Sequence, residues 1–321
     1  MLVKQLKNNR MKKLCLLILI VTNSISAQKI ERTMASVFDQ FPHVRDFAMT
    51  QNKDEVYFTV ESYKKEYSFI AFVKKVGDTW SVPKVASFSG QYKDLEPFLS
   101  SDGLKLYFAS NRVDNQSKGV KKDVDIWYVE RTSTASNWSS PKNIGAVINT
   151  DANEFYPSVT EKGDLFFTAA YKDALGKEDI YVSRLVNGNY TKPVPLSANV
   201  NSEKYEFNAF VAPDESFILY TSYGRKDGYG RGDLYISFKD KNNQWTPAKN
   251  LGKEINSNQI DYCPFVDLKT KTMYFTSDKN RVPKSFSSSK TINELMQVLK
   301  VDANGLGRIY QTDISKILEK K

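Results

Sequence analysis

The fold is decided by residues 151–202, which read DANEFYPSVTEKGDLFFTAAYKDALGKEDIYVSRLVNGNYTKPVPLSANVNS and whose pattern the chain repeats. An acidic residue and a proline, Glu154 and Pro157, open the stretch, and the extended runs 165–168 and 179–183 follow. Short runs rich in Phe, Tyr, Val and Thr between polar clusters are typical of strands and turns. A repeat of about 50 residues indicates a solenoid, a propeller or an array.

The remaining sequence supplies four more versions of this unit. The five repeats lie near residues 45–93, 94–150, 151–202, 203–257 and 258–315. Each contains four short extended runs, and four antiparallel strands per repeat are typical of a propeller blade. The sequence therefore predicts an all-β protein with a single β-propeller domain over residues 28–321. Five blades are favoured, and six remain possible if the two ends of the chain contain a degenerate unit.

The fifth repeat lacks its last strand. The lead-in Ala35–Phe38 reads like the end of the first repeat at Ala86–Phe88. We therefore expect an N-terminal strand at Ala35–Phe38 to complete the fifth blade and close the ring.

Residues 1–27 are expected to form a signal peptide. Five basic residues precede the apolar run Leu14–Val21, and small residues before Gln28 suit cleavage. No later stretch is long enough to span a membrane. We expect an exported protein of the periplasm or of the periplasmic side of the outer membrane. Cys15 would leave with the signal, so that Cys263 remains without a disulfide partner.

The charge of the chain argues against a nucleic-acid partner. The whole sequence has 46 basic and 37 acidic residues, a net charge of +9. Without the five basic residues of the expected signal, 41 basic residues remain and the net charge falls to +4. His43 is the single histidine, which argues against a histidine-rich zinc site. Asp302 begins a calcium-like loop, but Leu306 occupies a position that needs an oxygen ligand. No metal or cofactor is expected.

Several motifs resemble the WD40-like repeat of the TolB-type propellers found in exported bacterial proteins. They are a recurring acidic-x-x-Pro, the turn Ser101–Gly103, the strand end Tyr107–Arg112 and the run Asp179–Tyr181. The resemblance covers nearly all of the chain after residue 27 and implies a propeller that binds partners more often than it catalyses reactions. Five repeats differ from the usual six of TolB, and the first repeat lacks the proline and the Asp-Gly turn. Five blades also occur in unrelated sugar hydrolases.

One residue per repeat is a candidate for ligand binding at a mouth of the central channel. These residues are Arg45, Asp94, Glu154, Glu206 and Asp261. Four carboxylates and an arginine would suit a cation, a sugar or a basic peptide end, and a suitably spaced pair would suit glycosidic hydrolysis. The alternative is structural, because a residue type repeated in every blade also suits a turn cap or a bond to the next blade.

Three further sets admit two interpretations each. Arg112, Arg225 and Arg281 would bind an anion or pair with Asp125, Asp179 and Asp233. Trp80, Trp138, Tyr190 and Trp245 would stack on sugars or, as we favour, pack between blades. A helix near residues 285–301, with a capping box at Thr291 and Glu294, would be a lid or a docking helix.

The sequence thus favours a non-catalytic binding scaffold for a protein or polysaccharide of the cell envelope. The alternative is a carbohydrate-active enzyme, a glycoside hydrolase or a polysaccharide lyase, that uses the channel carboxylates. An architectural subunit of an envelope complex is a third possibility.

Overall fold

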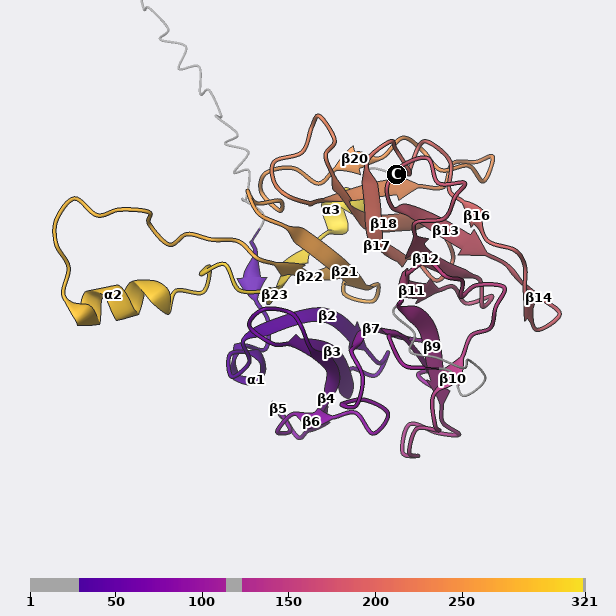
Figure 1. Cartoon of the computed structure of the whole chain (residues 1–321), viewed down its shortest axis with the longest axis horizontal. Helices are drawn as coiled ribbons and strands as arrows, with labels where there is room; N and C mark the ends of the chain where they lie inside the picture. The colour runs from indigo at the N-terminus through magenta and orange to yellow at the C-terminus, as the bar shows by residue number, and fades with distance from the viewer. Residues whose placement is uncertain (1–28, 114–122, 320–321) are drawn as a thin grey trace, which may run out of the picture.

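The computed structural model describes residues 29–113 and 123–319, and in them five antiparallel sheets surround a central axis (Figure 1). The predicted all-β, five-bladed propeller is confirmed. The expected signal peptide, residues 1–27, and most of the insertion 111–124 lie outside the described residues.

The strands of the first three blades follow one another from the axis outward. Blade 1 contains β2 (His43–Met49), β3 (Glu55–Glu61), β4 (Ser68–Val76) and β6 (Lys84–Val85), with β5 (Thr79–Trp80) paired to the end of β4. Blade 2 contains β7 (Asp94–Leu99), β8 (Lys105–Ser110), β9 (Asp125–Glu130) and β10 (Lys142–Asn143). Blade 3 contains β11 (Glu154–Val159), β12 (Leu165–Ala169), β13 (Asp179–Ser183) and β16 (Val194–Pro195), with a hairpin of β14 (Leu185–Val186) and β15 (Asn189–Tyr190).

The last two blades complete the ring. Blade 4 contains β17 (Tyr205–Val211), β18 (Phe217–Tyr223), β19 (Asp233–Phe238) and β20 (Lys249–Asn250). Blade 5 contains β21 (Asp261–Asp267), β22 (Thr272–Ser277), β23 (Arg308–Asp313) and β1 (Glu31–Arg32). The innermost strands contact one another in the order β2, β7, β11, β17, β21, and β21 contacts β2 again. A closed ring of this kind leaves only short sheet edges exposed.

The ring is closed by an N-terminal strand, but at other residues than the sequence predicts. Glu31 and Arg32 pair with Gln311 and Tyr310 of β23. The expected strand Ala35–Phe38 is instead the one-turn helix α1 (Ala35–Phe38). The chain leaves the sheet at Met34, which has a φ of 46° and therefore cannot continue an extended strand.

The burial of Phe38 explains why a helix replaces the expected strand. The helical turn places Val37 and Phe38 inside an apolar cluster with blade 1, where the Phe38 ring lies 4.9 Å from that of Phe58. Alternation along a strand would place these adjacent side chains on opposite faces.

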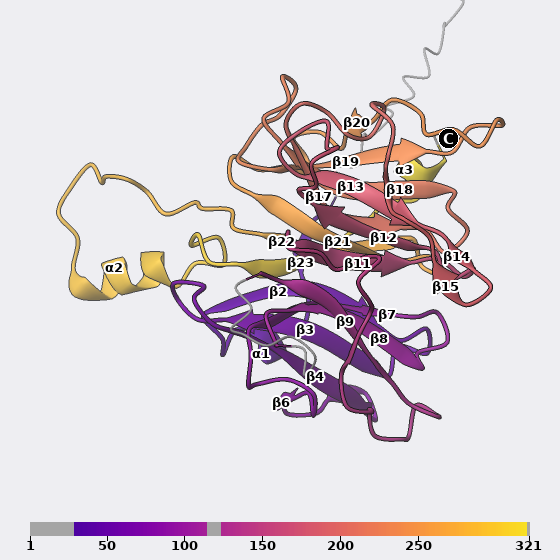
Figure 2. The same cartoon turned by 45° about the vertical axis from the view of Figure 1, so that its right-hand side comes forward.

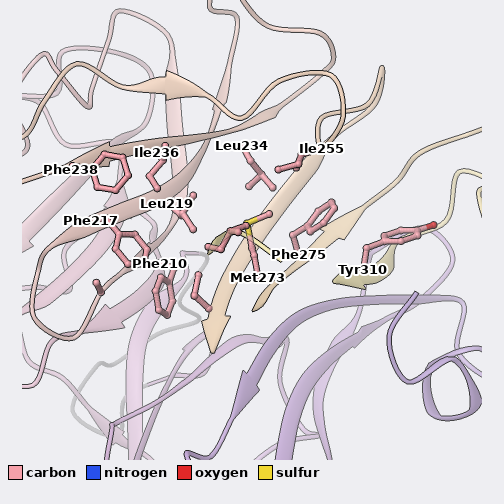
Figure 3. Packing of buried hydrophobic residues seen from close by; sticks show 13 residues of the cluster. Phe210, Phe217, Leu219, Leu234, Ile236, Phe238, Ile255, Met273, Phe275 and Tyr310 are labelled. Atoms are coloured by element: carbon pink, nitrogen blue, oxygen red, sulfur yellow. The ribbon is translucent and has the colours of Figure 1, made fainter. Parts of the chain in front are cut away.

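An apolar cluster fills each interface between adjacent blades. Between blades 4 and 5, Phe210, Phe217 and Leu219 face Met273 and Phe275 (Figure 3). The predicted packing role of the outer-strand aromatics is visible at two of these interfaces. The Trp138 indole N–H of blade 2 donates to the Tyr57 hydroxyl of blade 1 at 2.9 Å, and Trp245 of blade 4 packs edge-on against Phe166 of blade 3.

Two further helices belong to the end of the chain. Helix α2 (Ile292–Leu299) lies in the long connection between β22 and β23, and α3 (Ser315–Leu318) follows β23. The capping box predicted for α2 is present. The Thr291 hydroxyl accepts from the Glu294 backbone N–H, and the Glu294 carboxylate accepts from the Thr291 backbone N–H. No helix within the described residues is long and apolar enough to cross a membrane.

Candidate functional site

The four predicted acidic residues lie at the first or second position of the innermost strand of a blade, and all are fully buried. Asp94 accepts hydrogen bonds from Ser89, Ser110 and Arg112 at 2.6–2.8 Å. Glu206 accepts from Ser202 at 2.7 Å, and its other partners are Ser222 and Arg225. These partners belong to the acid's own blade or to the connection just before it. In both blades the acid ties the entry of the inner strand to the end of the second strand.

The other two acids are buried without an arginine partner. Glu154 accepts from the hydroxyl and the backbone N–H of Thr150, at 2.8 and 3.2 Å. Burial raises the pKa of Glu154 to about 7, although these bonds oppose the shift. Asp261 accepts from the Ser257 amide, and burial raises its pKa to about 6. Both carboxyls sit inside a blade and none of their surface is exposed to a ligand.

The predicted arginine pairs are wrong in two blades. Arg112 and Arg225 bind the strand-opening acids Asp94 and Glu206, not Asp125 and Asp233. Asp233 instead accepts from the backbone of the loop before it, at the amides of Tyr229 and Gly230, and Asp179 does the same at Leu175 and Gly176. In blade 4 the loop before Asp233 therefore satisfies this aspartate, and Arg225 binds the inner strand instead.

Arg45 lies one residue beyond the acidic position. Strand pairing aligns Val44 with the four acids, and it aligns Arg45 with Leu95, Phe155, Phe207 and Tyr262. The structure therefore separates Arg45 from the other predicted residues. Its side chain reaches the propeller axis instead of the interior of a blade.

A second ring, which the sequence analysis missed, lies two residues after the acids. Every innermost strand contains a β-bulge there, and the bulged residue has a φ between 49° and 61°. A bulge turns one side chain out of the alternating pattern. The five bulged residues, hereafter the axial residues, are Asp46, Glu96, Tyr156, Asn208 and Cys263.

Hydrogen bonds join the axial residues of different blades across the centre. The Glu96 carboxylate accepts from the guanidinium of Arg45 at 2.7 Å, from the Tyr156 amide at 2.7 Å and from the Asn208 side chain at 3.2 Å. The Tyr156 hydroxyl donates to the Pro264 carbonyl of blade 5 at 3.2 Å. The channel is therefore closed at the bulges by polar side chains from all blades.

The positive charge of Arg45 compensates the negative charges of Asp46 and Glu96 in this cluster. Its Nε lies 3.1 Å from Asp46, and its Nη2 lies 3.3 Å from the Cys263 sulfur as well as bonding Glu96. Burial alone would lower the pKa of Arg45, but the carboxylates of Asp46 and Glu96 raise it well above its usual value. Burial also raises the pKa of the Cys263 thiol, so that the sulfur stays protonated and unreactive. The charged neighbours of Cys263 are Arg45, Asp46 and Glu96.

The position of the axial residues could have been found from the prolines. In three repeats the axial residue directly precedes the proline of the acidic-x-x-Pro motif: Glu96, Tyr156 and Cys263. Their chemical types differ between blades, so a search for recurring residues passes over them.

The opposite end of the channel is a hollow of about 420 Å3 with a mixed apolar and polar lining. Phe98, Val159, Phe210 and Phe265 line it where the innermost strands end. It contains none of the predicted site residues.

The third candidate surface is the arm, defined here as residues 279–307. Helix α2 stands well apart from the sheets in both views (Figures 1 and 2). None of its residues is buried. Ile292, Met296 and Leu299, spaced to share one face, are 71%, 42% and 56% exposed. The lid interpretation of this helix is therefore wrong, because α2 does not pack on its own blade.

The fold is similar to those of solved propellers at low sequence identity. The catalytic domain of a Coprinopsis cinerea GH62 α-L-arabinofuranosidase matches with a TM-score of 0.51 and 10% identity over 86% of this chain and 92% of that chain. The α-L-arabinofuranosidase PaAbf62A from Podospora anserina, in complex with cellotriose, has the same TM-score and identity over 85% and 90%. TolB from Acinetobacter baumannii matches with a TM-score of 0.47 and 13% identity over 74% of this chain.

This chain spans about half the length of that TolB, 49%. No family model and no curated protein matches the sequence. At such identities the likeness establishes the β-propeller fold alone.

Proposed function

We propose that the protein is an exported, non-catalytic propeller that binds a protein partner of the cell envelope through its arm. The observation that carries this proposal is the exposed apolar face of α2. Isolated helices shorter than about 12–15 residues are marginally stable in water, and α2 has eight residues with none buried. A helix of this kind gains stability when its apolar face enters the groove of a partner.

The arrangement of carboxylates favours binding over hydrolysis. A glycosidase needs two carboxyl groups about 5–10 Å apart, free to reach the sugar. The four strand-opening acids are sealed inside their blades. Asp46 and Glu96 approach each other on the axis, but Arg45 binds both of them. We therefore do not propose a carbohydrate-active enzyme.

The test compares two double variants of α2 that change the charge equally. Ile292→Asp with Leu299→Asp disrupts the apolar face, whereas Asn293→Asp with Gln297→Asp alters only the polar face. Each immobilised protein is incubated with envelope extract, and captured proteins are identified and then titrated individually. We expect the first variant to lose capture and the second to retain it.

Equal capture by both variants would contradict the proposal. A glycan array run in parallel addresses the polysaccharide alternative. Specific glycan binding that is indifferent to both helix variants would favour a polysaccharide ligand on the propeller instead.

A further inference from the structure

A hollow of about 750 Å3 lies between blade 4 and the base of the arm. One wall is the loop 253–258, which leads from β20 to β21, and the other is formed by the two ends of the arm. These ends are joined by two backbone hydrogen bonds. The Arg281 backbone N–H donates to the Ala303 carbonyl at 2.7 Å, and the Gly305 backbone N–H donates to the Lys279 carbonyl at 3.2 Å. The hollow thus has an ordered wall on each side.

Blade 5 departs here from the arrangement in blades 2 and 4. Arg112 follows the last residue of its second strand by two positions and binds the strand-opening acid Asp94. Lys279 occupies the corresponding place after Ser277, but it makes no ion pair with any acid in the described part of the chain. Arg281 likewise has no ion pair there, and both side chains line the hollow.

Two of the cations at this hollow, Lys279 and Arg281, are not neutralised by an ion pair within the described residues. The Lys279 ammonium lies 3.5 Å from the centre of the Tyr310 ring. Burial and then the charge of Arg281 lower the pKa of Lys279 to about 8. Arg32 pairs with the carboxylates of both Asp302 and Asp39, and its Nε is buried without a hydrogen-bond partner. Mutual repulsion among like charges is relieved when an anion binds among them.

We propose that this hollow binds a small anionic ligand, a phosphate or carboxylate group carried on a polar body about the size of a sugar. Lys279 and Arg281 contact the anionic group.

The size and walls of the hollow define the rest of the ligand. Pockets for small organic ligands measure about 300–1,000 Å3, far more than a bare oxyanion needs. Ser257, Asn258 and Asn280 line the hollow and offer polar groups to sugar hydroxyls. This site is separate from the exposed face of α2, so that binding here and capture through α2 can fail independently.

The experiment is titration calorimetry of the whole mature protein with four probes: inorganic phosphate, glucose 1-phosphate, glucuronate and uncharged glucose. We expect saturable binding of at least one sugar anion and none of glucose. A preference for glucose 1-phosphate assigns a phosphate ligand, and a preference for glucuronate assigns a carboxylate ligand.

Two variants and a matched control test the residues. Lys279→Gln and Arg281→Gln each remove a charge-assisted contact and should weaken binding about 10-fold or more. Lys284→Gln removes the same charge from an exposed part of the arm outside the hollow and should leave binding unchanged. Because Arg281 is exposed, its variant tests the site without a risk to folding.

The pH dependence separates a ligand contact from a structural role. Binding should weaken as the pH rises from 7 to 9, because Lys279 loses its charge, and Lys279→Gln should abolish this part of the dependence. The other charged groups that line the hollow or act on Lys279 are Arg32, Lys253, Glu254, Asp261, Arg281 and Asp302. The absence of saturable anion binding, or equal affinities of the Lys279→Gln and Lys284→Gln proteins, would overturn the proposal.

Discussion

The strand-opening acids and the axial residues lie two positions apart on four of the innermost strands, yet their contacts differ: the acids bond within a blade and the axial residues bond between blades. The acids recur in four blades, are fully buried, and bond within their own blade. The axial residues differ in every blade and bond between blades across the centre. The strand-opening position has the same hydrogen-bonding role in four blades, and all four blades have a carboxylate there. The axial position faces a different set of neighbours in each blade, and its residue type differs in each blade.

The largest predicted effect comes from breaking the recurrent ring. Asp94→Ala leaves the Arg112 guanidinium, whose side chain is 9% exposed, buried without its carboxylate. Loss of one partner of a buried pair costs about 3–5 kcal/mol. We expect the free energy of unfolding in urea to fall by this amount. Glu66→Ala, at an exposed acid of blade 1, is the control. A loss below about 1 kcal/mol would return Asp94 to the list of ligand-binding candidates.

The second prediction concerns Glu154, a strand-opening acid that has no arginine partner, and the effect of its raised pKa on stability. The pKa of Glu154 is raised from its ordinary 4.5 to about 7, so the folded protein binds more protons than the unfolded chain between these values. The stabilising contribution of Glu154 is complete below pH 4.5 and is lost as the pH rises through 7.

Glu154→Gln removes this dependence. From pH 4.5 to 7 the wild-type protein should lose up to about 3 kcal/mol of unfolding free energy relative to the variant. Urea unfolding of both proteins across this range measures the difference. Parallel curves for the two proteins would show that Glu154 titrates normally.

The smallest predicted effect concerns the axial ring. Tyr156→Phe removes one hydrogen bond, to the Pro264 carbonyl, and keeps the ring in place. We expect a loss of about 1 kcal/mol in the free energy of unfolding. Tyr63→Phe, at a tyrosine 74% exposed, should have no measurable effect. A loss as large as that of Asp94→Ala would remove the contrast between the two rings.

Much of the fold could be predicted because blades are local units. Each repeat contains its strands, its turns and the aromatics that pack against the next blade, so the number of repeats predicts the number of blades. The predicted closure by an N-terminal strand followed from the missing strand of the fifth repeat. Its residues were wrong because Glu31–Arg32 is a two-residue strand without a pattern of its own, whereas Val37 and Phe38 carry an apolar signal that serves α1.

The candidate sites were harder to predict, because each depends on contacts between distant parts of the chain. Arg45 meets Glu96 and Cys263, which are 51 and 218 residues away in sequence. The hollow at the base of the arm joins Arg32 to Lys279 and Arg281, and only the closure of the ring brings them together.

By itself, the sequence determined the architecture: five β-rich repeats, a capped helix in the last of them, and acids that open the innermost strands. Hydrophobic periodicity and turn residues depend on local sequence, so they can be recognised when the same unit is repeated along the chain. The tertiary structure alone decided which side chains reach the axis, which arginine meets which acid, and where cations remain unpaired. These outcomes depend on bulges and on the closure of the ring, which place residues by geometry and not by their order in the chain.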